Sequence, residues 1–90
     1  MFNAHFYAIS IEKLLVPYGL AGEHSADEIE RNPIEFILAA LEAYDKHSSG
    51  KTEIINDFYN KYENDEKTNM NNMSEEYVIS LCEDLRRIFE

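Results

Sequence analysis

The chain has 90 residues, of which 18 are Asp or Glu and 8 are Lys or Arg, giving a formal charge of -10 at pH 7 and an isoelectric point near 4.6. This excess of carboxylates repels phosphate groups, so we expect no direct binding of nucleic acid or of anionic membrane surfaces. Hydrophobic residues make up 44% of the chain, which is enough for one small folded domain over residues 1–90 but leaves little room for a deep catalytic cleft, so we do not expect an enzyme.

The first residues lack the basic start and the small-residue cleavage site of a signal peptide. The longest apolar stretch, residues 34–43, contains two glutamates and is far shorter than the roughly 20 residues that span a bilayer. Cys82 is the single cysteine and cannot form an internal disulfide. We therefore expect a cytoplasmic protein.

The first half of the chain predicts a long helix and a short one. Asn3 can cap a helix over about residues 4–16, whose apolar residues recur at steps of three and four until Pro17 and Gly19. Ser25 and Glu28 have the Ser-x-x-Glu spacing of a capping box. Because Asn32-Pro33 follows so soon, only one or two turns fit there, and we expect a short connector helix.

The second long helix is predicted to begin at Pro33, with Asn32 as its cap, and to end at Ser48-Ser49-Gly50. A third helix is expected from about Thr52, with one apolar face. The residues on that face are Ile55, Phe58, Tyr59 and Tyr62.

Residues 64–72 are mostly polar and rich in Asn, and they predict the longest and most mobile loop. After it, Ser74 can cap a fourth helix, and Met73 can pack on Val78. An unbroken apolar stripe marks this helix: Val78, Leu81, Cys82, Leu85, Ile88 and Phe89. The sequence thus predicts an all-α fold, a small antiparallel bundle of about four helices, or a distorted version of one, with a short connector helix between the first and second.

No combination of residues predicts a catalytic, metal or cofactor site. The histidines His5, His24 and His47 lie in separate segments without the spacing that aims ligands at one metal ion, and we expect structural or surface roles for them. His24 could meet Asp27 and Glu28 on one helical turn, but a solvated connector explains that grouping as well. Cys82 lies in an apolar stripe, where a thiol is usually a small buried hydrophobe.

The run from Asp45 to Asn56 resembles an EF-hand loop, with Asp45 at the first position, Ser49 at the fifth, Gly50 at the turn and Glu53 at the ninth. It departs from that family at three positions. These are His47 at the third, Thr52 at the eighth, and Asn56 in place of the bidentate Glu at the twelfth. We expect an ordinary helix–helix connection and keep a degenerate calcium module as a lower-ranked alternative.

Carboxylates and tyrosines are the remaining unusual feature. Residues 23–35 hold five carboxylates against one Arg, and a second acidic group follows Tyr62. Tyrosines are enriched at interface centres, and surrounding carboxylates steer a basic partner. The predicted partner-binding residues are Tyr18, Glu23, Asp27, Glu28, Glu30, Tyr44, Tyr62, Asp65 and Glu66, with Tyr18, Tyr44 and Tyr62 as exposed anchors.

Such a surface complements the basic groove of a protein that itself binds nucleic acid. The leading hypothesis is an acidic inhibitor: an immunity protein or antitoxin against a nuclease toxin, or a phage-encoded blocker of a defence protein. Size, acidity and predicted helices are similar in kind to the nuclease-bacteriocin immunity proteins. The alternative is a non-inhibitory helical interaction module or a homodimeric accessory subunit.

Overall fold

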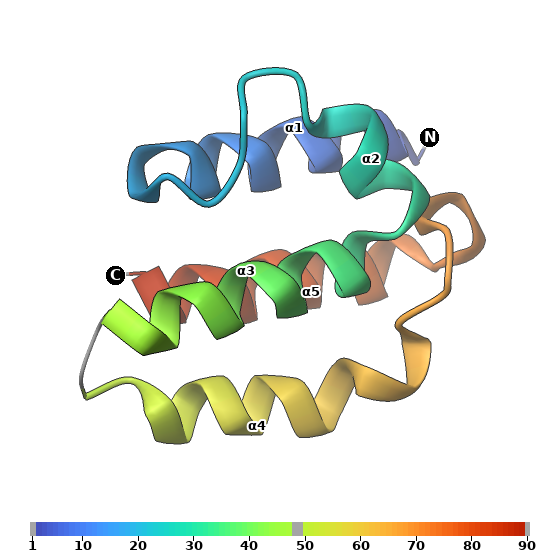
Figure 1. The fold of residues 1–90 in the computed structure, drawn as a ribbon. Helices are drawn as coiled ribbons and strands as arrows, with labels where there is room; N and C mark the ends of the chain where they lie inside the picture. The colour runs from blue at the N-terminus through green and yellow to red at the C-terminus, as the bar shows by residue number, and fades with distance from the viewer. Residues whose placement is uncertain (1, 48–49, 90) are drawn as a thin grey trace.

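The computed structural model describes residues 2–47 and 50–89. Helices and short 3₁₀ turns make up most of this part of the chain (Figure 1). In chain order they are α1 (Ala4–Leu15), η1 (Val16–Tyr18), α2 (Ala26–Arg31), α3 (Pro33–His47), α4 (Thr52–Tyr62), η2 (Glu63–Asp65), η3 (Met70–Asn72) and α5 (Glu75–Phe89). The predicted all-α fold, with four longer helices and a short connector between the first and second, is confirmed.

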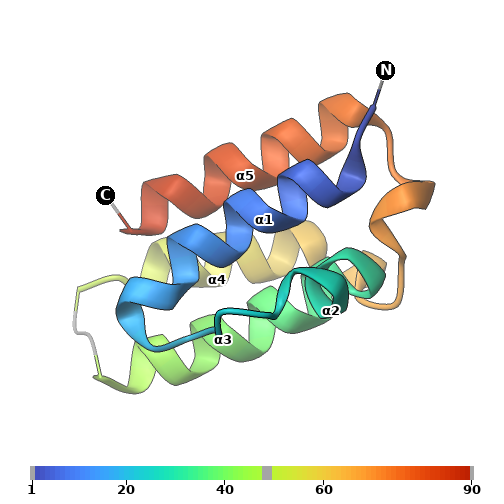
Figure 2. The ribbon, with the colours of Figure 1, turned by 90° about the horizontal axis from the view of Figure 1, so that it is seen from above.

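The helices form a small bundle whose consecutive members α3, α4 and α5 alternate in direction (Figures 1 and 2). In contrast, α1 and α5 lie side by side and run the same way. Hydrogen bonds join matching ends of the two helices. Tyr7 near the start of α1 bonds Glu75 at the start of α5, and Tyr18, just after the end of α1, bonds Phe89 at the end of α5. This is possible because α2 returns the chain along α1 before α3 begins.

The core is formed by the apolar stripes that the sequence predicts. The stripe of α5 is buried throughout, and α3 contributes Ile34, Ile37 and Leu41, each at most 1% exposed. Burying a side chain of this size stabilises the fold by about 1.5–3 kcal/mol. On α4, Ile55 and Phe58 are buried, but Tyr59 lies at the outer edge of the apolar face and is 46% exposed.

The predicted caps of the first and last helices are confirmed, whereas that of the connector helix is wrong. Asn3 Oδ1 accepts a hydrogen bond from the Phe6 amide at 3.2 Å, and Ser74 Oγ accepts one from the Tyr77 amide at 3.1 Å. The side chain of Ser25 does not cap α2. Its place is taken by Glu12 of α1.

Glu12 Oε1 accepts hydrogen bonds from the amides of Ser25 and Ala26, at 2.7 and 3.1 Å. The hydroxyl of Ser25 instead accepts one from the Gly22 amide at 3.0 Å. A carboxylate at a helix N-terminus satisfies free amides and complements the helix dipole. The first turn of α2 is therefore held by a neighbouring helix.

The expected loop of residues 64–72 is organised into the two 3₁₀ turns η2 and η3. Met70 is fully buried and anchors η3 in the core. The side chain of Asn69 accepts a hydrogen bond from the Asn71 amide at 2.8 Å. Composition alone misses this structure because it shows neither the burial of Met70 nor the bonds from Asp65 and Asn71 to other elements of the bundle.

Candidate protein-binding surface

The acidic residues of segment 23–35 lie on the outside of the bundle, around α2. Glu23, Asp27 and Glu28 are exposed, and Glu30 is half-buried. Successive residues of a helix are about 100° apart, whereas residues three apart share a side. Asp27 and Glu30 therefore point toward α1, and Glu28 points toward α3. The structure thus divides this predicted acidic group between two surfaces.

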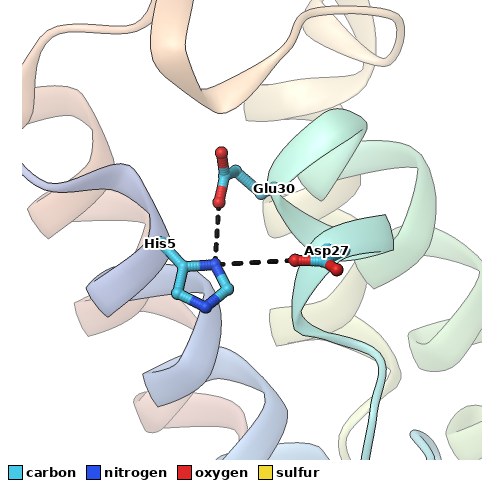
Figure 3. A group of neighbouring side chains, drawn as sticks. All are labelled: His5, Asp27 and Glu30. Carbon is cyan, nitrogen blue, oxygen red and sulfur yellow. Dashed lines mark hydrogen bonds and ion pairs between the residues drawn. The ribbon is translucent and has the colours of Figure 1, made fainter.

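The surface toward α1 contains a cluster of His5, Asp27 and Glu30 (Figure 3). His5 Nδ1 lies 2.9 Å from Glu30 Oε1 and 3.7 Å from Asp27 Oδ1. The other carboxylate oxygen of Glu30 accepts a hydrogen bond from the side-chain amide of Asn71 at 2.9 Å. The Asn71 bond, together with His5, lowers the pKa of Glu30, although partial burial opposes the shift. The cluster links α1, α2 and η3.

His5, Asp27 and Glu30 offer one nitrogen and two oxygens within 4.8 Å of one another, a ligand set that suits a divalent transition metal. The side chains of His5 and Asp27 are well solvated, with exposed fractions of 50% and 86%, whereas that of Glu30 is 25% exposed. In the sequence His5 and Glu30 are 25 residues apart, so no spacing motif relates them. His24, which the sequence analysis grouped with Asp27, lies beside this cluster, in a hollow of about 350 Å³ that Glu23 also lines.

The second surface is a hollow of about 450 Å³ between α2 and α3, called here the α2–α3 groove. Most of its lining residues are apolar, and two carboxylates are among them. The lining residues are Gly19, Leu20, Glu28, Asn32, Glu35, Phe36, Ala39, Ala40 and Ala43. Of the predicted partner-binding residues, Glu28 lies in this groove.

Two predicted anchors, Tyr18 and Tyr44, meet next to the groove. Their rings are 5.7 Å apart, edge to face, and Tyr18 also stacks on Phe89 at 4.7 Å. The Tyr18 hydroxyl donates a hydrogen bond to the carbonyl of Phe89 at 3.0 Å. Tyr18 is 45% exposed and Tyr44 is half-buried, so the pair presents an aromatic surface while closing the end of the bundle. Their role as anchors stays a prediction.

The prediction of Tyr62 as an exposed anchor is wrong, because its side chain is only 1% exposed. Its ring packs on Phe58 at 4.6 Å and meets the edge of Tyr77 at 5.7 Å. Its hydroxyl donates a hydrogen bond to Asp84 on α5. Burial and this bond raise the pKa of Tyr62. A tyrosine can be buried wherever a partner satisfies its hydroxyl, and here the partner is 22 residues away.

Asp65 and Glu66, the other predicted acidic pair, are half-buried. Asp65 accepts a hydrogen bond from the Tyr77 hydroxyl at 2.6 Å, so it stabilises the contact between η2 and α5. The neighbouring Lys67 pairs with Glu35 at 3.2 Å. This ion pair places the second acidic group beside the first turn of α3, close to the groove.

The EF-hand-like run falls partly outside the described residues, because Ser48, Ser49 and the side chain of His47 are not among them. Within the described part, Asp45 Oδ1 accepts a hydrogen bond from the Thr52 hydroxyl at 3.0 Å. This bond joins the end of α3 to the start of α4, as in an ordinary helix–helix connection.

Cys82 is the predicted buried hydrophobe on α5, with 6% of its surface exposed. Burial raises the pKa of its thiol to about 11. The thiol is therefore protonated at neutral pH, which does not suit a nucleophile.

In the part of the chain that the structure describes, every helix is too short or too polar to cross a membrane. Comparisons of the chain with protein-family models, with curated proteins and with solved structures found no match.

Proposed function

We propose that this chain is an acidic inhibitor that binds a basic, nucleic-acid-acting protein and covers its nucleic-acid-binding surface. An immunity protein or antitoxin against a nuclease toxin, or a phage-encoded blocker of a defence protein, would act in this way. The target would be met in the cytoplasm, where the lone, buried Cys82 needs no disulfide partner.

The main support for the proposal is that acidic side chains around α2 are exposed to solvent. Glu23, Asp27 and Glu28 are exposed there. Among the described residues, the ion pairs with basic or histidine side chains involve only the carboxylates Asp27, Glu30, Glu35 and Asp84. Glu23 and Glu28 are thus free to meet basic groups of a partner.

Inhibition would follow from competition for the same basic surface. A protein that binds nucleic acid uses Lys and Arg to contact phosphates and release counterions. Carboxylates on a small rigid bundle can pair with those cations instead, and the charge of -10 speeds the encounter. Nucleic acid and the inhibitor would then exclude each other.

The test is an affinity capture from lysate of the native host at low and moderate salt, with mass spectrometry of the bound proteins. The test variant is Glu23→Lys/Glu28→Lys, since neither side chain makes an ion pair in the described structure. The matched control is Glu53→Lys/Glu76→Lys, which changes the charge equally at exposed positions of α4 and α5.

We expect the wild type and the control to capture one basic nucleic-acid-acting protein, and association with the purified protein to slow on the order of tenfold or more in the test variant at low salt. The captured protein's activity on nucleic acid should fall when the wild type is added. Capture of no such protein, or equal association by the test variant and the wild type, would contradict the proposal.

The alternative, a helical interaction module or homodimeric subunit, is favoured by exposed apolar side chains on three helices. Phe6 is 61% exposed, Tyr59 46% and Ile79 38%. Exposed apolar side chains mark a contact with another chain where they form one continuous patch. This alternative predicts association that resists salt and weakens in Phe6→Ser. The acidic inhibitor predicts association that weakens with salt and is unchanged in Phe6→Ser.

A further inference from the structure

The α2–α3 groove combines mostly apolar lining residues with two carboxylates. Ala39 and Ala43 are exposed on α3 and four residues apart, so they lie on one side of the helix, and Phe36 and Leu20 flank them. Small side chains at this spacing let a second helix approach closely, because its side chains fill the space above the alanines. A groove of about 450 Å³ admits a few such side chains.

Carboxylates accompany this apolar strip on both helices. Glu28 of α2 and Glu35 of α3 are among the residues that line the groove. Glu42 is exposed and seven residues after Glu35, so it lies on the same side of α3 two turns further along. Among the described residues, no basic side chain pairs with Glu28 or Glu42, and Lys67 pairs with Glu35.

We propose that the α2–α3 groove binds an α-helix of the basic partner, with small or aliphatic residues along one side and Lys or Arg on both flanks. This inference rests on the proposed function for the basic character of the partner. The apolar side of such a helix faces Ala39 and Ala43, and its cations pair with Glu28 and Glu42. A helix that lies in a groove contacts it through residues at i, i+3, i+4 and i+7, which form one side of that helix.

A second copy of this chain fits the groove poorly. In a symmetric dimer the same surface faces itself, so the carboxylates of one copy would oppose those of the other. Like charges placed opposite each other weaken an interface, whereas cations on the flanks of a foreign helix strengthen it.

The experiment uses two synthetic peptides of about 18 residues, which is about five helical turns. The first has Ala and Leu along one side of a helix and Lys on both flanks, and the second has the same composition in scrambled order. Binding to the full chain is followed by the methyl resonances of Ala39 and Ala43, with buried Ala8 as the reference.

We expect the first peptide to shift the methyl resonances of Ala39 and Ala43 and to bind at least about tenfold more tightly than the scrambled one, a difference of about 1.4 kcal/mol. Ala43→Trp fills the groove and should remove this preference, whereas Asn60→Trp on the exposed side of α4 should keep it. Ala39→Gln is a smaller change that serves if Ala43→Trp does not fold. Equal binding of the two peptides, or an unchanged preference in Ala43→Trp or Ala39→Gln, would overturn the proposal.

The outcomes separate this inference from the proposed function. Suppose that neither peptide prefers the groove, while the wild type still captures a basic nucleic-acid-acting protein and Glu23→Lys/Glu28→Lys associates with it more slowly. The groove proposal then fails and the proposed function stands. If the first peptide binds in the groove but no nucleic-acid-acting protein is captured, the proposed function fails alone. If the wild type forms dimers and Ala43→Trp is monomeric, a second copy of the chain covers the groove, which also overturns the proposal.

Discussion

Asp84 is the described carboxylate with the most cationic partners, and it shows how one side chain supports two helices. It accepts hydrogen bonds from Lys61 Nζ at 2.7 Å, from the Tyr62 hydroxyl, and from Arg87 at 2.9 Å. Partial burial raises its pKa, but the bonds from Lys61 and Tyr62 and the charges of Lys61 and Arg87 outweigh burial and lower it. The ionised form of Asp84 is thus favoured by folding.

Asp84→Asn should therefore destabilise the fold by about 1.5–3 kcal/mol at pH 7, the usual range for hydrogen bonds to a charged group. Because the pKa of Asp84 is lower in the folded state, its contribution is complete above about pH 4 and is lost as the pH falls through the folded pKa. Wild type and variant should hence approach equal stability in acid. Urea denaturation at neutral and acidic pH measures both differences.

Glu83→Gln, at the exposed neighbouring position on α5, is the control for Asp84→Asn and should change stability by no more than about 0.5 kcal/mol. A loss in Asp84→Asn that stayed the same from pH 7 into acid would mean that packing, rather than ionisation, explains the role of Asp84.

At the scale of elements, α2 depends on its neighbours more than on its own sequence. It has six residues, too few to be stable alone. Its N-terminus is capped by Glu12 of α1, and Glu30 near its C-terminus contacts His5 and Asn71. These contacts hold the helix that displays the acidic surface.

Glu12→Ala should cost about 1 kcal/mol of stability, the typical loss for a helix cap, and should speed hydrogen exchange of the Ser25 and Ala26 amides. Lys13→Ala, at the exposed next position of α1, is the control and should leave that exchange unchanged. Protection of the Ser25 and Ala26 amides that survives in Glu12→Ala, together with protection of the Glu28 amide that disappears in Ser25→Ala, would restore the capping box that the sequence suggests.

At the scale of the whole molecule, the charge of -10 is spread over a bundle only 38 × 27 × 21 Å in extent. Carboxylates held this close repel one another in the folded state, and salt screens that repulsion. The same charge that steers a basic partner therefore lowers the stability of the free protein.

Raising NaCl from about 0.02 to about 0.5 M, which shortens the screening length several-fold, should raise the Tm of the free protein by a few degrees. Glu23→Lys/Glu28→Lys has a smaller net charge and should gain less, as thermal unfolding followed by circular dichroism can show. A Tm that falls with salt would mean that ion pairs such as Lys61–Asp84 outweigh the general repulsion.

The helices, most of the core and the sign of the surface charge follow from the sequence. The caps at Asn3 and Ser74 and the stripe of α5 act between residues three or four apart, so the chain shows them directly. The charge needs only a count of residues.

Which side chains meet across helices, in contrast, depends on how the helices pack in three dimensions. Tyr62 is buried because Asp84 reaches its hydroxyl, α2 is capped by Glu12 rather than by Ser25, and the acidic segment divides between the His5 cluster and the α2–α3 groove. These partners are 13 to 25 residues apart, and Tyr18 and Phe89 are 71 apart. Their pairing depends on how the helices pack, because a helix pattern gives the buried face of each element but not the residue that will lie opposite it.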